Sequence, residues 1–152
     1  MSNDLDQPRR APMIRLLSDV FEDFSDELFR RLAAVGYSDL RAGHGCVFGT
    51  IDPDGSRLTD LADRARMTKQ SVGEAATDLE RRGYVERLPD ATDGRVKIIR
   101  LTDSGREAQR VGFALIDEME RDWAERYGED KIAALREALE AIAAQPRSSV
   151  PA

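Results

Sequence analysis

The sequence has little of the chemistry from which secreted domains, metal sites and membrane anchors are built. It holds one cysteine, Cys46, and one histidine, His44, too few for an internal disulfide or the usual Cys/His zinc sites. No apolar run exceeds four residues, whereas a membrane-spanning helix needs about 20. The opening residues, MSNDLDQPRR, lack the apolar core of a signal peptide. We therefore expect a cytoplasmic protein without a membrane anchor, metal or other cofactor.

A recognisable set of catalytic groups is also absent. The chain has no glycine-rich phosphate loop, no pair of carboxylates at a catalytic spacing, and too few histidines and cysteines for a nucleophile with its base. Aromatic residues are scarce, at 6%, whereas 41% of the residues are hydrophobic and 34% are charged. This composition indicates one globular, helix-rich domain that is not an enzyme.

Charge is unevenly distributed along the chain. The net charge of -6, taken globally, argues against a polyanionic partner. However, residues 56–106 hold 11 Lys and Arg against 9 Asp and Glu, and the remaining 101 residues hold 12 against 20. The middle third is therefore weakly basic and its flanks are acidic. This pattern suits a nucleic-acid-binding surface on an acidic body, although charge alone leaves the choice open.

The N-terminal third is expected to hold a polar arm and two helices. Residues 1–12 are polar, carry two prolines and show no period, which indicates a disordered arm. Apolar residues then recur every three or four positions from Ile14 to Val35, and Gly36 suits the end of this long helix. A second helix is expected from about Ser38 to Ile51, before turn residues at 52–55.

The weakly basic middle region has the pattern of a winged helix. Thr59 and Thr68 are placed to cap two short helices separated by a tight turn, and the second helix is expected to end at Gly83. Residues 84–88 and 96–101 are rich in β-branched and apolar side chains, and the segment PDATDGR between them is typical of a turn. The sequence therefore predicts a helix-turn-helix followed by a β-hairpin.

The C-terminal third is helical again. An apolar stripe runs from Val111 to Trp123, Gly128 interrupts the pattern, and a shorter amphipathic stripe spans Ile132 to Ile142. Residues 145–152 have the composition of a disordered tail. The predicted fold is mainly α with a small β-hairpin wing. In the single domain 13–144, helices at 13–51 and 103–144 flank a winged helix-turn-helix at 56–102.

Two local motifs resemble those of the MarR (multiple antibiotic resistance regulator) family of bacterial transcription regulators. LERRGYVERLPD closes the helix-turn-helix, and Asp93-Gly94-Arg95 followed by Leu101-Thr102 fits the wing pattern D-x-R-x5-L-T. With the order of helices, the resemblance spans nearly the whole chain. It implies a homodimer whose first and last helices interdigitate and flank the DNA-binding lobe. It also implies a recognition helix in the major groove of double-stranded DNA and a wing arginine in the minor groove.

Two features depart from a typical DNA-binding helix-turn-helix. The turn carries Arg66 where glycine is common, and the recognition helix carries Glu74 and Asp78 where a DNA-facing surface favours cations. The acids keep an alternative open, a winged helix that serves as a protein-interaction module without DNA binding.

The stretch from Thr68 to Thr77 is the expected base-reading surface, because the first turns of a recognition helix lie deepest in the groove. Lys69 can contact phosphate or guanine, Gln70 can pair with an adenine edge, and Glu74 can accept from cytosine or simply face solvent. At the wing tip, the Asp93 carboxylate can hold the Arg95 guanidinium in a defined pose for a narrow minor groove, with a surface ion pair as the simpler interpretation. The candidate DNA-binding residues are Thr68, Lys69, Gln70, Ser71, Gly73, Glu74, Asp93, Arg95 and Lys97. Further cations are interpreted as phosphate contacts or solvated charges: Arg81, Arg82, Arg87 and Arg100.

A ligand site is the least specific expectation. The resemblance implies small aromatic or phenolic ligands bound between the dimerisation region and the DNA-binding lobe, beside the second helix. His44 is a candidate to hydrogen-bond such a ligand, with Phe24, Tyr37 and Phe48 as its apolar wall, although a structural histidine is the simpler interpretation. Cys46 is expected to be a small buried hydrophobe, since redox-sensing members carry their reactive cysteine in the first helix.

These observations together predict a sequence-specific DNA-binding transcription regulator. The expected protein is a homodimeric repressor that binds a near-palindromic operator and releases it when a small ligand binds.

Overall fold

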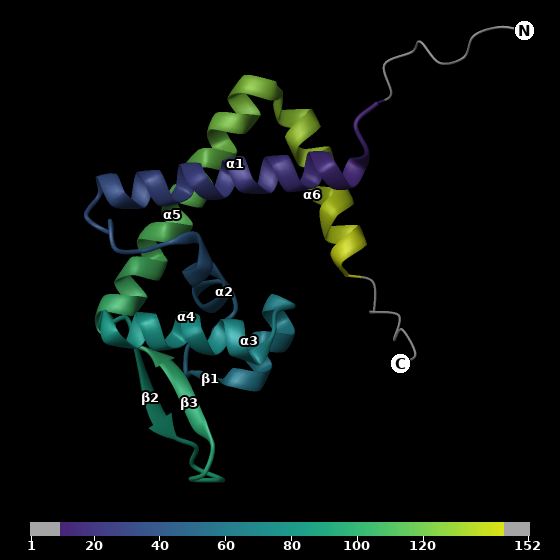
Figure 1. The fold of residues 1–152 in the computed structure, drawn as a ribbon. Helices are drawn as coiled ribbons and strands as arrows, with labels where there is room; N and C mark the ends of the chain where they lie inside the picture. Colours follow the sequence, from purple (N-terminus) through teal and green to yellow (C-terminus); the bar gives the residue numbers. More distant parts are fainter. Residues whose placement is uncertain (1–9, 145–152) are drawn as a thin grey trace, which may run out of the picture. The chain divides into compact units, whose positions relative to one another are not determined.

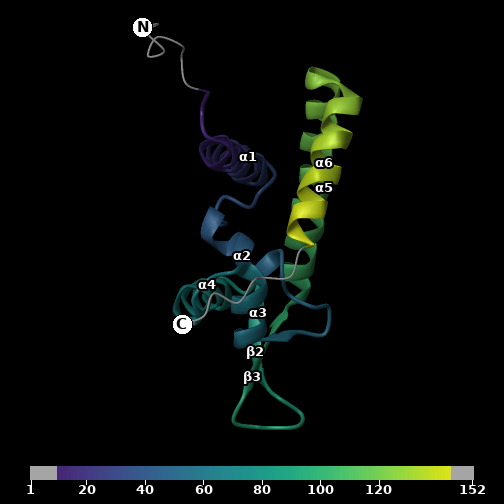
Figure 2. The same cartoon turned by 90° about the vertical axis from the view of Figure 1, so that its right-hand side faces the viewer.

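The computed structural model describes residues 10–144 in two compact units, which meet in sequence between Gly112 and Phe113. Most of the described chain is helical, with one small antiparallel sheet, as predicted (Figures 1 and 2). The predicted arm lies mostly, and the predicted tail wholly, outside the described residues. The elements in chain order are α1 (Met13–Ala34), η1 (Ala42–His44), α2 (Gly45–Phe48), β1 (Ser56–Arg57), α3 (Leu58–Ala65), α4 (Lys69–Arg81), β2 (Val85–Pro89), β3 (Lys97–Leu101), α5 (Asp103–Tyr127) and α6 (Glu129–Ala143).

Helix α1 matches the long helix predicted from the N-terminal stripe. It ends where Gly36 takes a φ of 104°, a left-handed conformation that glycine adopts without a Cβ penalty. The amide of Tyr37 then donates to the carbonyl of Leu32 at 2.9 Å, which satisfies an orphan carbonyl of the last turn. Leu32 is buried, whereas the apolar residues of the first half of the helix are exposed.

The segment after α1 is less helical than expected. The predicted helix over 38–51 is wrong in its extent, because the structure has only the 3-10 turn η1 and the single-turn helix α2. Gly43, Gly45 and Gly49 interrupt this segment, and each glycine costs about 1 kcal/mol relative to alanine in a helix. Even so, this segment contributes Leu40 and Val47 to the core.

Helices α3 and α4 form the predicted helix-turn-helix. Thr68 caps α4 as expected, because its Oγ1 accepts a hydrogen bond from the Ser71 amide at 3.1 Å. The prediction that Thr59 caps α3 is wrong: the cap lies two residues earlier, at an extended Arg57 without a side-chain hydrogen bond, and the helix begins at Leu58. The buried residues of α3, Leu61 and Ala62, lie inside the helix with either start, so the error changes no core residue.

The turn between α3 and α4 passes through Arg66 in the left-handed conformation, with φ 55° and ψ 39°. Arg66 is the only non-glycine residue with positive φ in the described part of the chain. The sequence shows an arginine where glycine is common, and the structure shows that the backbone nevertheless adopts the glycine-like conformation. For an L-residue this conformation costs roughly 1–2 kcal/mol.

A three-stranded antiparallel sheet of order β1-β3-β2 forms the wing and its stem. The predicted hairpin is confirmed, with Val85 opposite Leu101 at its base and Pro89 opposite Lys97 near its tip. Strand β1 was not predicted, because two residues are too short to show a period. Its pairing with β3 fixes the start of α3 against the hairpin.

Thr102 joins the recognition helix, the hairpin and α5. Its Oγ1 donates to the carbonyl of Gly83, just beyond α4, at 2.5 Å. The same oxygen accepts from the amide of Gly105 at 3.1 Å and so caps α5. A Cβ at Gly105 would lie 1.9 Å from the carbonyl oxygen of Tyr84, so only glycine fits there. The Leu-Thr pair of the wing motif is therefore a structural junction.

The core of the first unit lies between the helix-turn-helix and the sheet. Tyr84 is packed against it, and burial raises the pKa of this phenol to about 12, helped by its hydrogen bond to Asp39. The buried members of the core are Leu40, Val47, Leu61, Ala62, Val72, Ala76, Leu79, Tyr84, Val85, Ile99, Leu101 and Ala108.

The second unit consists of the end of α5 and helix α6. They are separated at Gly128, whose φ of 107° confirms the predicted break. Within this unit, Arg136 of α6 forms an ion pair with Glu120 of α5. None of the helices between residues 10 and 144 combines the length and the apolar content that a bilayer crossing requires.

Candidate nucleic-acid interface

One face of α4 is buried and the other is open, as the sequence predicts. Val72, Ala76 and Leu79 are fully buried against the core. The opposite face carries residues of the stretch that the sequence predicts to read bases: Lys69, Gln70, Gly73, Glu74 and Thr77. These five residues span the first nine positions of the helix, from Lys69 to Thr77.

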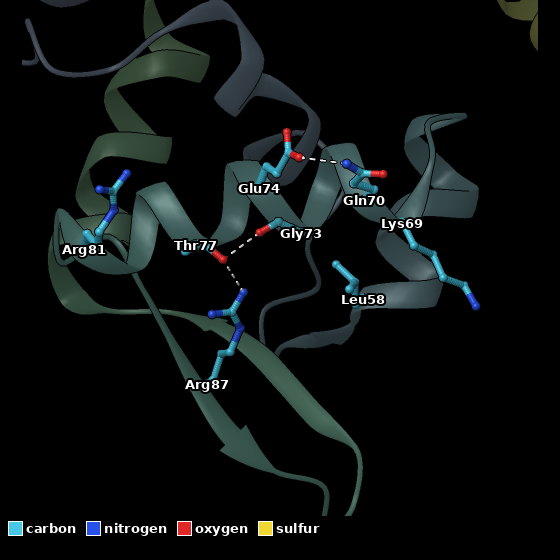
Figure 3. Close-up of a pocket in the computed structure, with 8 residues that line it drawn as sticks. All are labelled: Leu58, Lys69, Gln70, Gly73, Glu74, Thr77, Arg81 and Arg87. Atoms are coloured by element: carbon cyan, nitrogen blue, oxygen red, sulfur yellow. Dashed lines mark hydrogen bonds between the residues drawn. The ribbon is translucent and has the colours of Figure 1, made fainter.

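The open face of α4 lines a hollow together with residues from two other elements (Figure 3). Leu58 comes from the start of α3, and Arg87 rises from β2 toward the middle of the helix. The complete lining is Leu58, Lys69, Gln70, Gly73, Glu74, Thr77, Arg81 and Arg87. We call this surface the α4 face. Leu58 is its one member that sequence reasoning missed, because an apolar residue ahead of a helix-turn-helix looks like core.

Hydrogen bonds arrange the polar side chains of the α4 face. The Gln70 amide nitrogen donates to the Glu74 carboxylate at 3.2 Å, which leaves the amide oxygen of Gln70 free of that contact. Arg87 donates to the Thr77 hydroxyl at 3.0 Å and pairs with Glu80, so its guanidinium is held over the helix. Thr77 in turn donates to the Gly73 carbonyl at 2.8 Å. The face thus presents the Gln70 amide beside Glu74 and, separately, the Arg87 guanidinium held beside Thr77 (Figure 3).

Two of the predicted site residues have distinct positions on this helix. Ser71 is turned toward the N-terminal cap, where its hydroxyl lies 2.9 Å from that of Thr68. Gly73 lies on the open face, and a Cβ there would meet only Leu58, at an ordinary contact distance of 3.7 Å. The fold itself therefore does not require glycine at position 73.

Asp78 does not belong to the α4 face. The expectation that it faces outward with Glu74 is wrong, because its carboxylate accepts from His44 Nε2 at 2.8 Å and from Arg82 Nε at 2.9 Å. Arg81 donates to the other oxygen at 2.7 Å. The Arg82 contact, followed by the His44 contact, lowers the pKa of Asp78 to about 2. One of the two acids that seemed to oppose DNA binding therefore stays charged but is paired with cations and only 20% exposed.

The wing tip holds Arg95 outward, but not in the way the sequence suggested. The Asp93 carboxylate accepts a hydrogen bond from the backbone amide of Arg95 at 3.0 Å and not from its guanidinium. Within the described residues, the Arg95 guanidinium has no ion pair, and the side chain is exposed. Lys97, at the first position of β3, is exposed as well. The carboxylate thus shapes the turn and leaves the arginine available.

A second aspartate, just beyond β2, fixes the start of the wing loop. Asp90 pairs with Arg57 of β1 and accepts hydrogen bonds from the amide and hydroxyl of Thr92, both at 2.9 Å. The Thr92 amide, followed by the hydroxyl, lowers the pKa of Asp90. These contacts hold the start of the loop between β2 and β3 against β1, although no sequence pattern indicated them.

The residues expected to bind a ligand lie near one another but have partners within the chain. His44 is 4% exposed, with Nε2 against Asp78 and Nδ1 accepting from the Arg41 amide at 3.1 Å. Tyr37 and Phe48 pack around Tyr84, with ring centroids 6.5 and 6.2 Å away. Phe24 is half-buried on α1. Whether these residues bind a ligand stays a prediction.

Cys46 has the environment of a structural residue. Its thiol donates to the carbonyl of Gly43 at 3.1 Å, and burial raises its pKa. Since the thiolate is the reactive form, a raised pKa disfavours reactivity.

Helices α3 and α4 and the three-stranded sheet together form a winged helix-turn-helix. The sequence model of the MarR family matches residues 46–96, from α2 to the wing. The wing pattern D-x-R-x5-L-T continues beyond that match to Thr102. Over these residues the chain is similar to the MarR family, and its fold is that of solved MarR-family structures.

Solved structures share the fold over most of the chain. The reduced form of MarR from E. coli superposes with a TM-score of 0.75 at 19% identity, covering 89% of this chain and 98% of that one. FabT from Streptococcus pneumoniae, in complex with DNA, gives 0.71 at 20% identity over 86% and 92%. CouR from Rhodococcus jostii RHA1, bound to p-coumaroyl-CoA, gives 0.69 at 24% identity over 86% and 91%. No curated protein matches the sequence.

Proposed function

We propose that this chain is a cytoplasmic, homodimeric repressor that binds a near-palindromic operator through the α4 face and the wing. The observation that carries the proposal is the arrangement of charge around α4. Three cations, the Gln70 amide and the carboxylate of Glu74, which accepts from that amide, line the face, while Asp78 is turned away from it and paired with His44 and Arg82. The face therefore carries more cations than acids, which favours a polyanion, because phosphates attract cations and repel carboxylates.

In this proposal, the first turns of α4 read bases in the major groove. Gln70 has a free amide oxygen and a second amide hydrogen, the pair needed for the N6/N7 edge of adenine. Lys69 contacts phosphate or guanine, and the bare Cα of Gly73 lets the duplex approach. Arg95 enters the minor groove, and three cations beside these surfaces contact phosphates: Arg81, Arg87 and Lys97.

A second copy of the chain is the proposed partner of α1 and α6. The first half of α1 exposes a dense apolar set, in which Ile14 is 79% and Phe21 73% exposed, and Ile142 of α6 is 70% exposed. Apolar patches of this kind are typical of interfaces. A two-fold dimer presents two recognition helices, so half-sites should lie about one helical turn apart, roughly 10 bp from centre to centre.

Selection of duplexes from a random-sequence library tests the DNA-binding proposal. The selected sites should form an inverted repeat, and the affinity measured by fluorescence anisotropy should fall steeply with salt because phosphate contacts release counterions. Sedimentation should give a dimer. A monomer, or binding that salt does not change, would instead favour the winged helix as a protein-contact module.

Release by a small ligand is the finer part of the proposal. It is supported by the p-coumaroyl-CoA bound to CouR, which shares the fold, and by the aromatic cluster of Tyr37, Phe48 and Tyr84. An acidic or phenolic ligand here would compete with Asp78 for His44 Nε2–H. Titrating p-coumaroyl-CoA and simple phenolic acids into the complex of protein and operator should lower the anisotropy. No release by any of these compounds would remove phenolics from the proposal.

A further inference from the structure

One hydrogen bond links the recognition helix to a segment 34 residues earlier in the chain. His44 Nδ1 accepts from the Arg41 amide, so the ring hydrogen lies on Nε2, which donates to Asp78 at 2.8 Å. Both ring nitrogens are thus used, and the ring is almost fully buried. The tautomer, the ring orientation and the donor direction are all fixed by these two contacts.

Asp78 is held from its own helix as well. Arg81 and Arg82 donate to its two oxygens at 2.7 and 2.9 Å and so fix its rotamer. Arg82 also lies 4.0 Å from Asp39, which accepts from the Tyr84 hydroxyl at 2.9 Å. The polar contacts therefore run from α4 to two residues of the segment between α1 and α2, Asp39 and His44.

This segment lies between α1 and α4 in both views (Figures 1 and 2), and η1 contacts both helices. The remaining contacts of α4 with the core are apolar, made by Val72, Ala76 and Leu79. Apolar packing is non-directional and tolerates small rotations, whereas a hydrogen bond weakens steeply when its angle changes. The contact of His44 with Asp78 is therefore the directional constraint between η1 and the recognition helix.

We infer that His44 is a positioning residue for DNA binding, which fixes the rotation of α4 relative to the segment that follows α1. This inference rests on the proposed function, because it concerns how a dimer matches two half-sites. If α1 holds the dimer together, His44 transmits the position of the dimer to each recognition helix. The consequence is selectivity for the spacing between half-sites, a property distinct from affinity for either one.

Two substitutions at position 44 separate the inferred role from simple packing. Asn can accept from the Arg41 amide in place of Nδ1 but is too short to reach Asp78. Gln extends its amide nitrogen toward the position of Nε2 and can still donate to Asp78. Both variants remove the imidazole ring, but His44→Asn breaks the hydrogen bond to α4 and His44→Gln keeps it. Asp78→Ser cuts the same link from the helix and serves as the second variant.

The experiment uses full-length protein and the selected inverted repeat, with one base pair added or removed at its centre. We expect wild type to lose about tenfold in affinity on either altered spacing, as it would for a mismatched base pair. His44→Asn and Asp78→Ser should reduce this loss to about threefold, and His44→Gln should restore it. Thermal melts followed by circular dichroism check that each variant is folded, and Asp78→Ser carries the test if His44→Asn unfolds.

The outcomes separate the inference from the function on which it rests. Wild type that binds no duplex, or shows no preferred spacing, contradicts the proposed dimeric repressor. Wild type with a clear optimum, together with variants that weaken equally on all three spacings, contradicts the positioning role and makes His44 a structural residue. Failure of His44→Gln to restore the optimum while His44→Asn retains it would also overturn the inference.

Discussion

Two aspartates close to cations have different roles. Asp78 lies on the side of α4 away from the α4 face, and Asp93 lies at the wing tip. The Asp78 carboxylate accepts from the side chains of His44, Arg81 and Arg82. The Asp93 carboxylate accepts from a backbone amide, that of Arg95. Asp78 thus forms ion pairs with its neighbouring cations, whereas Asp93 shapes the turn and leaves the Arg95 guanidinium exposed.

The difference lies in what the chain can reach from each position. On a helix, an aspartate has neighbours at i+3 and i+4, here Arg81 and Arg82, and a side chain packed behind the helix can approach it too. At a tight turn, the nearest donor is the amide two residues on, which gives an Asx turn. An aspartate therefore joins two elements when it faces the core, as Asp78 does. At the wing tip, Asp93 shapes the turn and leaves the Arg95 side chain exposed.

The largest expected effect comes from removing the acid of the junction. Asp78→Ala deprives the buried His44 donor of its acceptor, and a buried unpaired donor costs about 1–3 kcal/mol. We expect a thermal midpoint several degrees lower and at least about a hundredfold weaker operator binding, because α4 loses both its stability and its orientation. Melts and anisotropy on the selected operator measure the two losses. A variant that binds like wild type would show that the junction is irrelevant to DNA binding.

The pH dependence of stability should show the same junction. The pKa of Asp78 is lowered from 3.8 to about 2, so its charge stabilises the folded state above about pH 4, and this contribution is lost as the pH falls toward 2. Asp78→Asn is the matched control, since its amide oxygen can still accept from His44 but does not titrate. The difference in urea midpoint between the two proteins should stay nearly constant from pH 6 to about pH 5 and then shrink as the pH falls toward 2. A constant difference would contradict the assigned contacts.

The wing tip should affect DNA binding without affecting the fold. Arg95→Ala should weaken operator binding about tenfold, because a cation is lost from the minor groove. The slope of log K against log salt should fall by about one unit, because one fewer counterion is released. Arg95→Lys should restore the slope and part of the affinity, since it keeps the charge but not the guanidinium fork. Both variants should melt like wild type. A salt slope unchanged in Arg95→Ala would mean that the tip does not meet DNA.

The comparison also shows how much the sequence could predict. The cap at Thr68, the two faces of α4 and the hairpin follow from local periodicity and turn chemistry, and all are observed. The orientation of Asp78 does not follow from local pattern. On a helical wheel Asp78 lies near the border of the polar face, and only the tertiary contact with His44 decides where its carboxylate points. The contact between the Asp93 carboxylate and the Arg95 amide was missed because the proximity of opposite charges suggested an ion pair.

Arg66→Gly tests whether stability alone explains the loss expected at the junction. Glycine relieves the left-handed conformation of residue 66, and we expect about 1 kcal/mol of added stability with unchanged operator affinity. Combined with Asp78→Ala, it should raise the thermal midpoint without restoring DNA binding. Recovery of both together would show that Asp78 acts only through the stability of the lobe.

The smallest effect is expected at the other aspartate. Asp93→Asn keeps an oxygen that can accept from the Arg95 amide, and it removes a negative charge next to DNA, so affinity should stay equal or rise slightly. Asp93→Ala loses the acceptor, the turn loosens, and we expect about threefold weaker binding with an unchanged salt slope, because ordering the freed residues costs entropy on binding. If the acid instead held the guanidinium, Asn and Ala would weaken binding alike. Anisotropy at two salt concentrations separates these cases, and a larger loss for Asn than for Ala would contradict the backbone role assigned to Asp93.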